Sequence, residues 1–166
     1  MNVFKQTKFN MKKLWVVTLL AALSFGCVKS NDSGSCTDVT PESEASTISS
    51  FCAANGITAQ KDENGIFYQV IDPGTTPTPD LNDTISVLYT TKLLDGTILD
   101  DHQTTPYTGI LNNFIDGWKL GIPKIAKGGQ MKMVVPSSLC YGCYGYPGAV
   151  PSNAILYFDI KLVDVK

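Results

Sequence analysis

The segment from Pro136 to Asp159 holds the residues with the clearest potential for chemistry, because it is rich in tyrosine, glycine and proline. Its centre, residues 141–151, reads YGCYGYPGAVP. Glycine permits a positive φ or a close backbone approach and proline fixes φ, so we expect a loop of defined shape. A stiff aromatic loop that leads into a strand, here residues 155–159, is typical of the wall of a binding pocket. The alternative is a structural Ω-loop whose tyrosines pack on the domain.

The composition of the 166-residue chain argues against several classes of function. All of its cations are lysines, so it has no arginine fork with which to bind phosphates or base edges. His102 is the single histidine, which argues against a histidine-based metal site, and we interpret it as a surface residue. We therefore expect no nucleic-acid partner and no metal, in a chain that holds one domain with short appendages.

An apolar run occupies residues 14–25, after two lysines and directly before Gly26 and Cys27. It is shorter than the ~20 residues that a membrane-spanning helix needs, so it is typical of a signal peptide. Residues 23–27 read LSFGC and resemble a bacterial lipobox, although the leucine usually stands one place nearer the cysteine. We expect residues 1–27 to be a signal peptide and the exported protein to be lipidated at Cys27. The alternative to lipidation is a plain secretory signal with an incidental Cys27. The position of the start, at Met1 or at Met11, is also open.

The anchor would hold the protein on the periplasmic or outer-membrane face of a bacterial envelope. After residue 27 the chain carries nine lysines and fifteen acidic residues, a net charge of −6. Such a domain is not attracted to anionic lipid, so the acyl chains would provide the membrane attachment.

A short helix is expected after a polar tether. Residues 28–40 are rich in serine, aspartate, asparagine and glycine, which is typical of a flexible spacer. Thr40 followed by Pro41 supplies an N-cap and a proline at the first helical position, and Gly56 stands where a helix would end. We predict a helix over about residues 41–55, within an N-terminal unit of residues 41–60.

From residue 61 to residue 166 the pattern predicts an α+β domain. Apolar residues alternate with polar ones in five segments, which we interpret as strands. Residues 114–125 carry apolar side chains at helical spacing, interrupted by Pro123. We therefore expect an antiparallel, strongly twisted sheet of about five strands wrapped around one short helix.

Five clusters of residues, in order and at similar spacing, resemble the FKBP-type peptidyl-prolyl cis-trans isomerases over about residues 62–166. The clusters are residues 87–90 with the turn at 95–96, Leu99 with Asp100, residues 114–118, the loop 141–151 and residues 154–159. Any one cluster alone would be a weak signal. The resemblance implies the FKBP fold and isomerisation of X-Pro peptide bonds.

Matching by position, the resemblance implies which residues form the site. It implies catalytic roles for Tyr89, Asp100, Trp118, Tyr141 and Phe158. It implies substrate-binding roles for Leu99, Tyr107, Phe114, Ile115, Tyr146 and Val150. In the family, the tryptophan lies beneath the proline ring, while the loop tyrosine and the backbone N–H at the isoleucine position hold substrate carbonyls.

Two departures from the family pattern affect this site. Leu99 stands where an aromatic residue is usual, and the segment 106–111 is about one residue shorter. These departures leave open a non-catalytic peptide-binding or chaperone module on the same fold.

The resemblance also implies the partners. They would be proline-containing unfolded or folding polypeptides of the envelope, and FK506-like macrolides. The protein would act as a monomer without a cofactor.

The cysteines allow more than one interpretation. If Cys27 is acylated, four remain, an even number that suits disulfides in an oxidising compartment. Of the three possible pairings we favour Cys36 with Cys52 and Cys140 with Cys143, and free thiols are the alternative. The C-x-x-C motif at residues 140–143 could also indicate thiol-disulfide exchange, but that chemistry favours a motif at the start of a helix.

Overall fold

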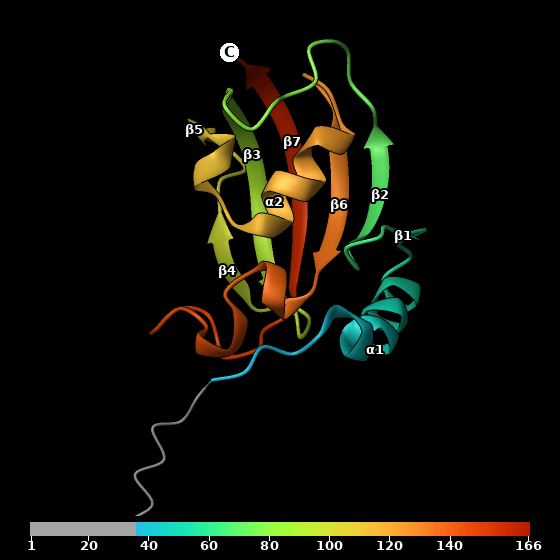
Figure 1. Cartoon of the computed structure of the whole chain (residues 1–166). Coiled ribbons are helices and arrows are strands. Elements are labelled where there is room, and N and C mark those ends of the chain that lie inside the picture. Colours follow the sequence, from blue (N-terminus) through green and yellow to red (C-terminus); the bar gives the residue numbers. More distant parts are fainter. Residues whose placement is uncertain (1–35) are drawn as a thin grey trace, which may run out of the picture. The chain divides into compact units, whose positions relative to one another are not determined.

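The computed structural model describes residues 36–166. The expected signal peptide, the lipidated Cys27 and most of the tether lie outside this range. The described chain forms a twisted antiparallel sheet with a short helix, α2, against one of its faces (Figure 1). None of the helices in this range is both long enough and apolar enough to cross a membrane.

The sheet has seven strands in the order β1-β2-β6-β7-β3-β4, and β5 also pairs with β3. Every pairing is antiparallel. The strands are β1 Gln60–Lys61, β2 Phe67–Asp72, β3 Thr84–Leu93, β4 Ile98–Asp101, β5 Tyr107–Ile110, β6 Gln130–Val135 and β7 Leu156–Val165. The predicted fold class is confirmed, with β1 and β5 in addition to the five strands expected. Both are short and largely exposed, so neither shows the alternation on which a sequence prediction depends.

The helix expected over residues 114–125 consists of two shorter pieces. Helix α2 covers Asp116–Gly121, and a 3₁₀ turn, η2, covers Ile122–Lys124, which includes the proline. A Cβ at Gly117 would lie 2.5 Å from Val135 Cγ1, and one at Gly121 would lie 2.6 Å from Met133 Sδ. The two glycines therefore let α2 approach β6 closely, and this approach sets the depth of Trp118.

Alternation along β6 and β7 separates two apolar clusters. Met133, Val135 and Phe158 belong to the main core under α2, whereas Val134 and Tyr157 face the other side of the sheet. Helix α1, Pro41–Ala54, covers that second side with Ile48, Cys52 and Phe51. The rings of Phe51 and Tyr157 lie 5.8 Å apart.

The ends of α1 follow the expected signals in part. Thr40 occupies the N-cap position, but its side chain makes no capping bond, and the hydroxyl of Ser43 donates to the Thr40 carbonyl instead. At the other end Gly56 has a φ of 64°, and the N–H of Ile57 donates to the carbonyl of Cys52 at 2.9 Å. This is a Schellman ending, which explains why the helix stops before Gly56.

The disulfide differs from the favoured pairings. Cys36 is bonded to Cys143, so the pairings of Cys36 with Cys52 and of Cys140 with Cys143 are both wrong. Cys52 lies on the buried face of α1, and the Cys140 thiol points toward the Val135 carbonyl. Residues 36–40, the end of the expected tether, are consequently held against the domain. The sequence prediction failed because the pairing depends on the tertiary structure, which brings together two cysteines that are 107 residues apart.

Candidate active site

One cavity of about 460 Å³ opens beside α2, between β3, β4 and the loop after β6. Every residue to which the sequence assigned a catalytic or substrate-binding role lines this cavity. These residues are Tyr89, Leu99, Asp100, Tyr107, Phe114, Ile115, Trp118, Tyr141, Tyr146, Val150 and Phe158. The volume lies in the range of ordinary small-ligand pockets.

Three further residues line the same cavity and had not been identified from the sequence: Thr91, Asn113 and Ala149. Thr91 could have been found, because it lies two residues after Tyr89 on β3 and alternation places both side chains on one face. Asn113 and Ala149 carry no such signal, since they lie outside the strands.

Trp118 lies at the bottom of the pocket and is only 4% exposed. Its ring packs edge-on against Tyr89, with centroids 4.9 Å apart, and against Phe158 at 5.8 Å. Phe114 stacks on it at 5.0 Å with an interplanar angle of 30°. Within residues 36–166 the indole N–H has no hydrogen-bond partner. The floor is therefore a rigid aromatic surface with one unused donor.

Tyr89 and Asp100 form a polar pair at the edge of this floor. The Tyr89 hydroxyl donates to Asp100 Oδ2 at 2.5 Å, across the β3–β4 pairing. Burial, followed by the hydrogen bond to Asp100 and its charge, raises the pKa of Tyr89 well above its ordinary value. The hydroxyl thus stays protonated, and the bond fixes the orientation of the ring.

His102 supports this pair from outside the cavity. Its ring stacks on Tyr89 with centroids 5.1 Å apart, and its Nε2 lies 3.6 Å from Asp100 Oδ1. The histidine is half-buried, so the interpretation as a plain surface residue missed its contacts. No spacing rule could have found them, because they depend on the path of the chain after β4.

The loop of residues 140–151, which we call the flap, forms the wall opposite β3. Tyr146 and Val150 exchange two backbone hydrogen bonds of 2.8 Å, and Gly145 has a φ of 62° at a point where a Cβ would overlap the Val150 carbonyl. The ring of Tyr146 lies 5.9 Å from that of Tyr141. The flap therefore has the defined shape that its glycines and prolines predict.

Tyr141 lines the cavity while remaining 39% exposed. Burial is the largest cause that raises its pKa, followed by the charges of Cys140, Asp100 and Tyr146. The group is thus a hydrogen-bond donor at neutral pH. Ile115 lies at the N-cap of α2, where the first backbone N–H groups have no partner within the helix.

The remaining wall comes from β5 and the residues around it. The ring of Tyr107 lies 5.8 Å from that of Phe114, and Tyr107 is 45% exposed. A Cβ at Gly109 would lie 2.9 Å from the Phe114 ring, so glycine lets β5 pass close to it. Despite the shortened segment, Tyr107 reaches the cavity.

The C-x-x-C motif has little capacity for thiol-disulfide exchange. Cys143 is bonded to Cys36, outside the motif. Burial, followed by the charge of Glu44, raises the pKa of the Cys140 thiol. Because the thiolate is the reactive species, a half-buried thiol of raised pKa is a poor nucleophile.

Known proteins resemble this chain over the domain that carries the pocket. In sequence, Escherichia coli FkpA, an FKBP-type peptidyl-prolyl cis-trans isomerase, is 41% identical over 104 residues, 61% of this chain and 38% of FkpA. Peptidyl-prolyl cis-trans isomerase Mip of Coxiella burnetii is 34% identical over 105 residues, 62% of this chain and 46% of Mip. The chain thus spans less than half the length of these curated relatives.

Solved structures give the same result. The crystal structure of Escherichia coli FkpA has a TM-score of 0.64 and 34% identity, over 76% of this chain and 62% of that one. A peptidyl-prolyl cis-trans isomerase from Pseudomonas syringae has a TM-score of 0.64 and 30% identity, over 78% of this chain and 98% of that one. The model of the family described as FKBP-type peptidyl-prolyl cis-trans isomerase matches residues 76–163. This chain therefore belongs to the FKBP-type peptidyl-prolyl cis-trans isomerase family.

Proposed function

We propose that this protein is a peptidyl-prolyl cis-trans isomerase that acts on proline-containing, unfolded or folding polypeptides. The observation that carries the proposal is the cavity of about 460 Å³, floored by Trp118 and walled by the rings of Tyr89, Phe114 and Phe158. Membership of the family supports it.

The reaction needs little more than such a pocket. Rotation about an X-Pro bond faces a barrier of ~18–20 kcal/mol, because resonance gives the C–N bond partial double-bond character. Twisting the amide breaks this resonance and reduces the dipole of the carbonyl. An apolar pocket that excludes water therefore favours the twisted state over the planar one, and this difference lowers the barrier.

Each part of the pocket has a role in this mechanism. Trp118 supports the proline ring, and Phe158, Tyr89 and Leu99 desolvate it from the sides. The Tyr141 hydroxyl and the Ile115 N–H bind the flanking carbonyls and orient the peptide. Asp100 acts as a positioning residue, since it holds the Tyr89 ring through its hydrogen bond.

The outer residues Tyr107, Tyr146 and Val150 extend the apolar surface along the peptide. Two of them are largely exposed, Tyr107 at 45% and Tyr146 at 58%, which suits contact with sequences of many kinds. The same surface would accept FK506-like macrolides, and a relative in Dictyostelium discoideum is named FK506-binding protein 4.

The alternative function is a peptide-binding module without turnover. Leu99 favours it, because a leucine forms an apolar wall without the flat ring contact that an aromatic residue would give the proline. Exchange between the isomers of a short Xaa-Pro-Phe peptide, followed by NMR, separates the two functions. We expect the wild-type protein to accelerate exchange and Trp118→Ala to reduce kcat/KM by about 100-fold.

Two controls make this assay specific. Tyr144 is 78% exposed and does not line the cavity, so Tyr144→Ala should leave exchange unchanged. Cys140→Ser should also keep the acceleration, which a thiol mechanism would not allow. Peptide binding by the wild-type protein without faster exchange would reject the isomerase in favour of the binding module.

For the location, we propose export and attachment to a bacterial envelope through a lipidated Cys27. The apolar run and LSFGC sequence of residues 14–27 support this, and a relative in Legionella longbeachae is named outer membrane protein MIP. Palmitate labelling should succeed with the wild-type protein and fail with Cys27→Ala. Labelling of both proteins, or of neither, would contradict the anchor.

A further inference from the structure

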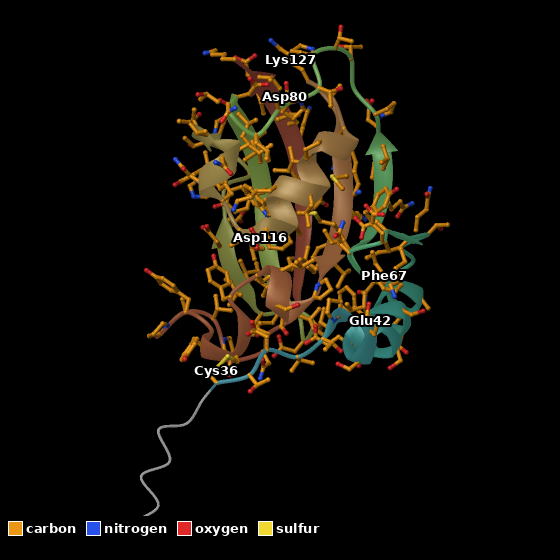
Figure 2. All side chains as sticks on the ribbon, viewed as in Figure 1. Cys36, Glu42, Phe67, Asp80, Asp116 and Lys127 are labelled. Atoms are coloured by element: carbon orange, nitrogen blue, oxygen red, sulfur yellow. A yellow bond between two sulfur atoms is a disulfide. The ribbon has the colours of Figure 1, made fainter. Side chains whose placement is uncertain are left out.

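The segment before and within the first turn of α1, residues 36–44, contacts the flap from outside the pocket. Figure 2 shows Cys36 beside the loop that carries the flap and Glu42 on α1. We propose that Asp38 and Glu44 are positioning residues of the active site, which act by holding the flap and with it Tyr141. The catalytic part of this inference rests on the proposed isomerase function.

Asp38 holds the flap directly after Tyr141. Its Oδ1 accepts the backbone N–H of Cys143 at 2.7 Å, a charge-assisted hydrogen bond between residues 105 positions apart. Gly142, between Tyr141 and Cys143, has a φ of 57°, and a Cβ at this position would overlap Asp38 Oδ1. The carboxylate thus occupies space that only a glycine at position 142 leaves free.

Glu44 holds the chain directly before the flap. It is 7% exposed, and its two oxygens accept the backbone N–H of Ser137 at 2.8 Å and the Ser137 hydroxyl at 2.7 Å. Ser137 is fully buried and begins η3, Ser137–Leu139, the turn that leads into the flap. Both oxygens of a buried carboxylate are therefore used on one residue of the loop that carries Tyr141.

The two contacts bracket Tyr141, which lies four residues after Ser137 and two before Cys143. The disulfide between Cys36 and Cys143 adds a covalent connection on the same side. None of the residues of segment 36–44 lines the cavity. The segment therefore acts on the pocket indirectly, through the flap and through Ser137 before it.

Loss of either carboxylate would leave the flap free to sample more conformations. A peptide would then have to order the flap on binding, so its affinity would fall. Once the peptide is bound, the pocket is the same, and the isomerisation step changes little. We therefore expect the effect in KM and not in kcat.

The test uses the full chain with two pairs of variants. Asp38→Ala removes the acceptor, whereas Asp38→Asn keeps an oxygen in its place. Glu44→Ala removes a buried carboxylate, and Glu42→Ala, on the exposed side of the same turn, is the matched control. The readouts are kcat and KM for an Xaa-Pro-Phe peptide, and amide hydrogen exchange of each residue by NMR.

We expect Asp38→Ala to raise KM by about tenfold with kcat nearly unchanged. Amide exchange should become faster at Cys143 and its neighbours in the flap but not in β3 or β7. Asp38→Asn should restore most of both values, Glu44→Ala should act in the same direction as Asp38→Ala, and Glu42→Ala should have no effect.

Unchanged KM and flap exchange in Asp38→Ala would overturn the inference. So would a uniform rise of exchange across the sheet, because that result would mean general destabilisation. Should the wild-type protein prove not to be an isomerase, the proposed function fails, while flap exchange and the Kd of the peptide still decide whether the segment positions the flap.

Discussion

At the scale of single residues, the pocket separates an apolar floor from polar groups at its rim. Trp118 and Phe158 are almost fully buried, at 4% and 2% exposure, whereas Tyr141 keeps contact with solvent. The Tyr89 hydroxyl donates to Asp100 Oδ2, so this donor at the edge of the floor already has a protein partner. This division suits a reaction that needs a dry site and a few directed hydrogen bonds.

The hydroxyl of Tyr141 should matter for peptide binding, while its ring serves as the wall. We expect Tyr141→Phe to reduce kcat/KM by about tenfold, since one hydrogen bond to the peptide carbonyl is lost. The peptide exchange assay measures this directly. Tyr144→Phe removes a hydroxyl from the exposed side of the same flap and should change nothing. Equal effects of the two variants would contradict a direct contact of Tyr141 with the peptide.

The tyrosines with a raised pKa should make the fold sensitive to alkali. Burial, followed by the charge of Asp159, raises the pKa of Tyr157 from 10.0 to about 12. The folded state then holds this proton more tightly than the unfolded state, so stability is complete below pH ~10 and falls as the pH rises toward ~12. Between pH ~9 and ~11, the free energy of unfolding should decrease less in Tyr157→Phe than in the wild-type protein.

Urea unfolding at both pH values measures this effect. Burial raises the pKa of Tyr89 and Tyr141 as well, so part of the alkaline decrease should persist in Tyr157→Phe. An identical decrease in the variant and the wild-type protein would show that Tyr157 ionises as freely in the folded state as in the unfolded chain.

At the scale of elements, each side of the sheet has its own helix. Helix α2 covers the face that carries the pocket, and α1 covers the opposite face with a smaller apolar cluster. The strand β6 joins the two, because Met133 and Val135 point to one side and Val134 to the other.

Ile48 should be the main residue that holds α1 on the sheet, because it is fully buried in the smaller cluster. We expect Ile48→Ala to lower the free energy of unfolding by about 2–4 kcal/mol through lost burial and an unfilled cavity. Urea unfolding measures it. Ser49→Ala, on the exposed side of α1, should stay within about 0.5 kcal/mol of the wild-type protein. A loss below 1 kcal/mol for Ile48→Ala would indicate a loosely docked helix.

At the scale of the whole molecule, the disulfide closes residues 36–143 of the described residues 36–166 into one loop. Cys36 and Cys143 are 107 residues apart, so the bond strongly restricts the unfolded state. We expect Cys36→Ser to lower the free energy of unfolding by about 4 kcal/mol, measured with urea. A dithiol reductant should lower the stability of the wild-type protein by a similar amount and leave that of Cys36→Ser unchanged. If the reductant has no effect on the wild-type protein, this disulfide does not stabilise the fold.

Much of the fold could be predicted because local pattern carries it. The alternation in β3 and β7 predicts which side chains face the core, and the interruption expected at Pro123 lies in the 3₁₀ turn that follows α2. The pocket residues were predicted from the family resemblance, because the local sequence pattern does not show which distant residues contact one another. The alternation rule could have identified Thr91, which was missed. It could not have identified the contacts of His102, since these depend on the turn after β4.

The sequence by itself determined the class of the fold and the order of its elements, because residue type and spacing decide local backbone preferences and which faces are buried. Tertiary structure alone decided the partner of Cys36, the use of Asp38 and Glu44, and the place of the flap over the pocket. The disulfide and the two carboxylate contacts join residues about a hundred positions apart. Such contacts arise only when burial of the shared core brings distant segments together, and no local spacing records them.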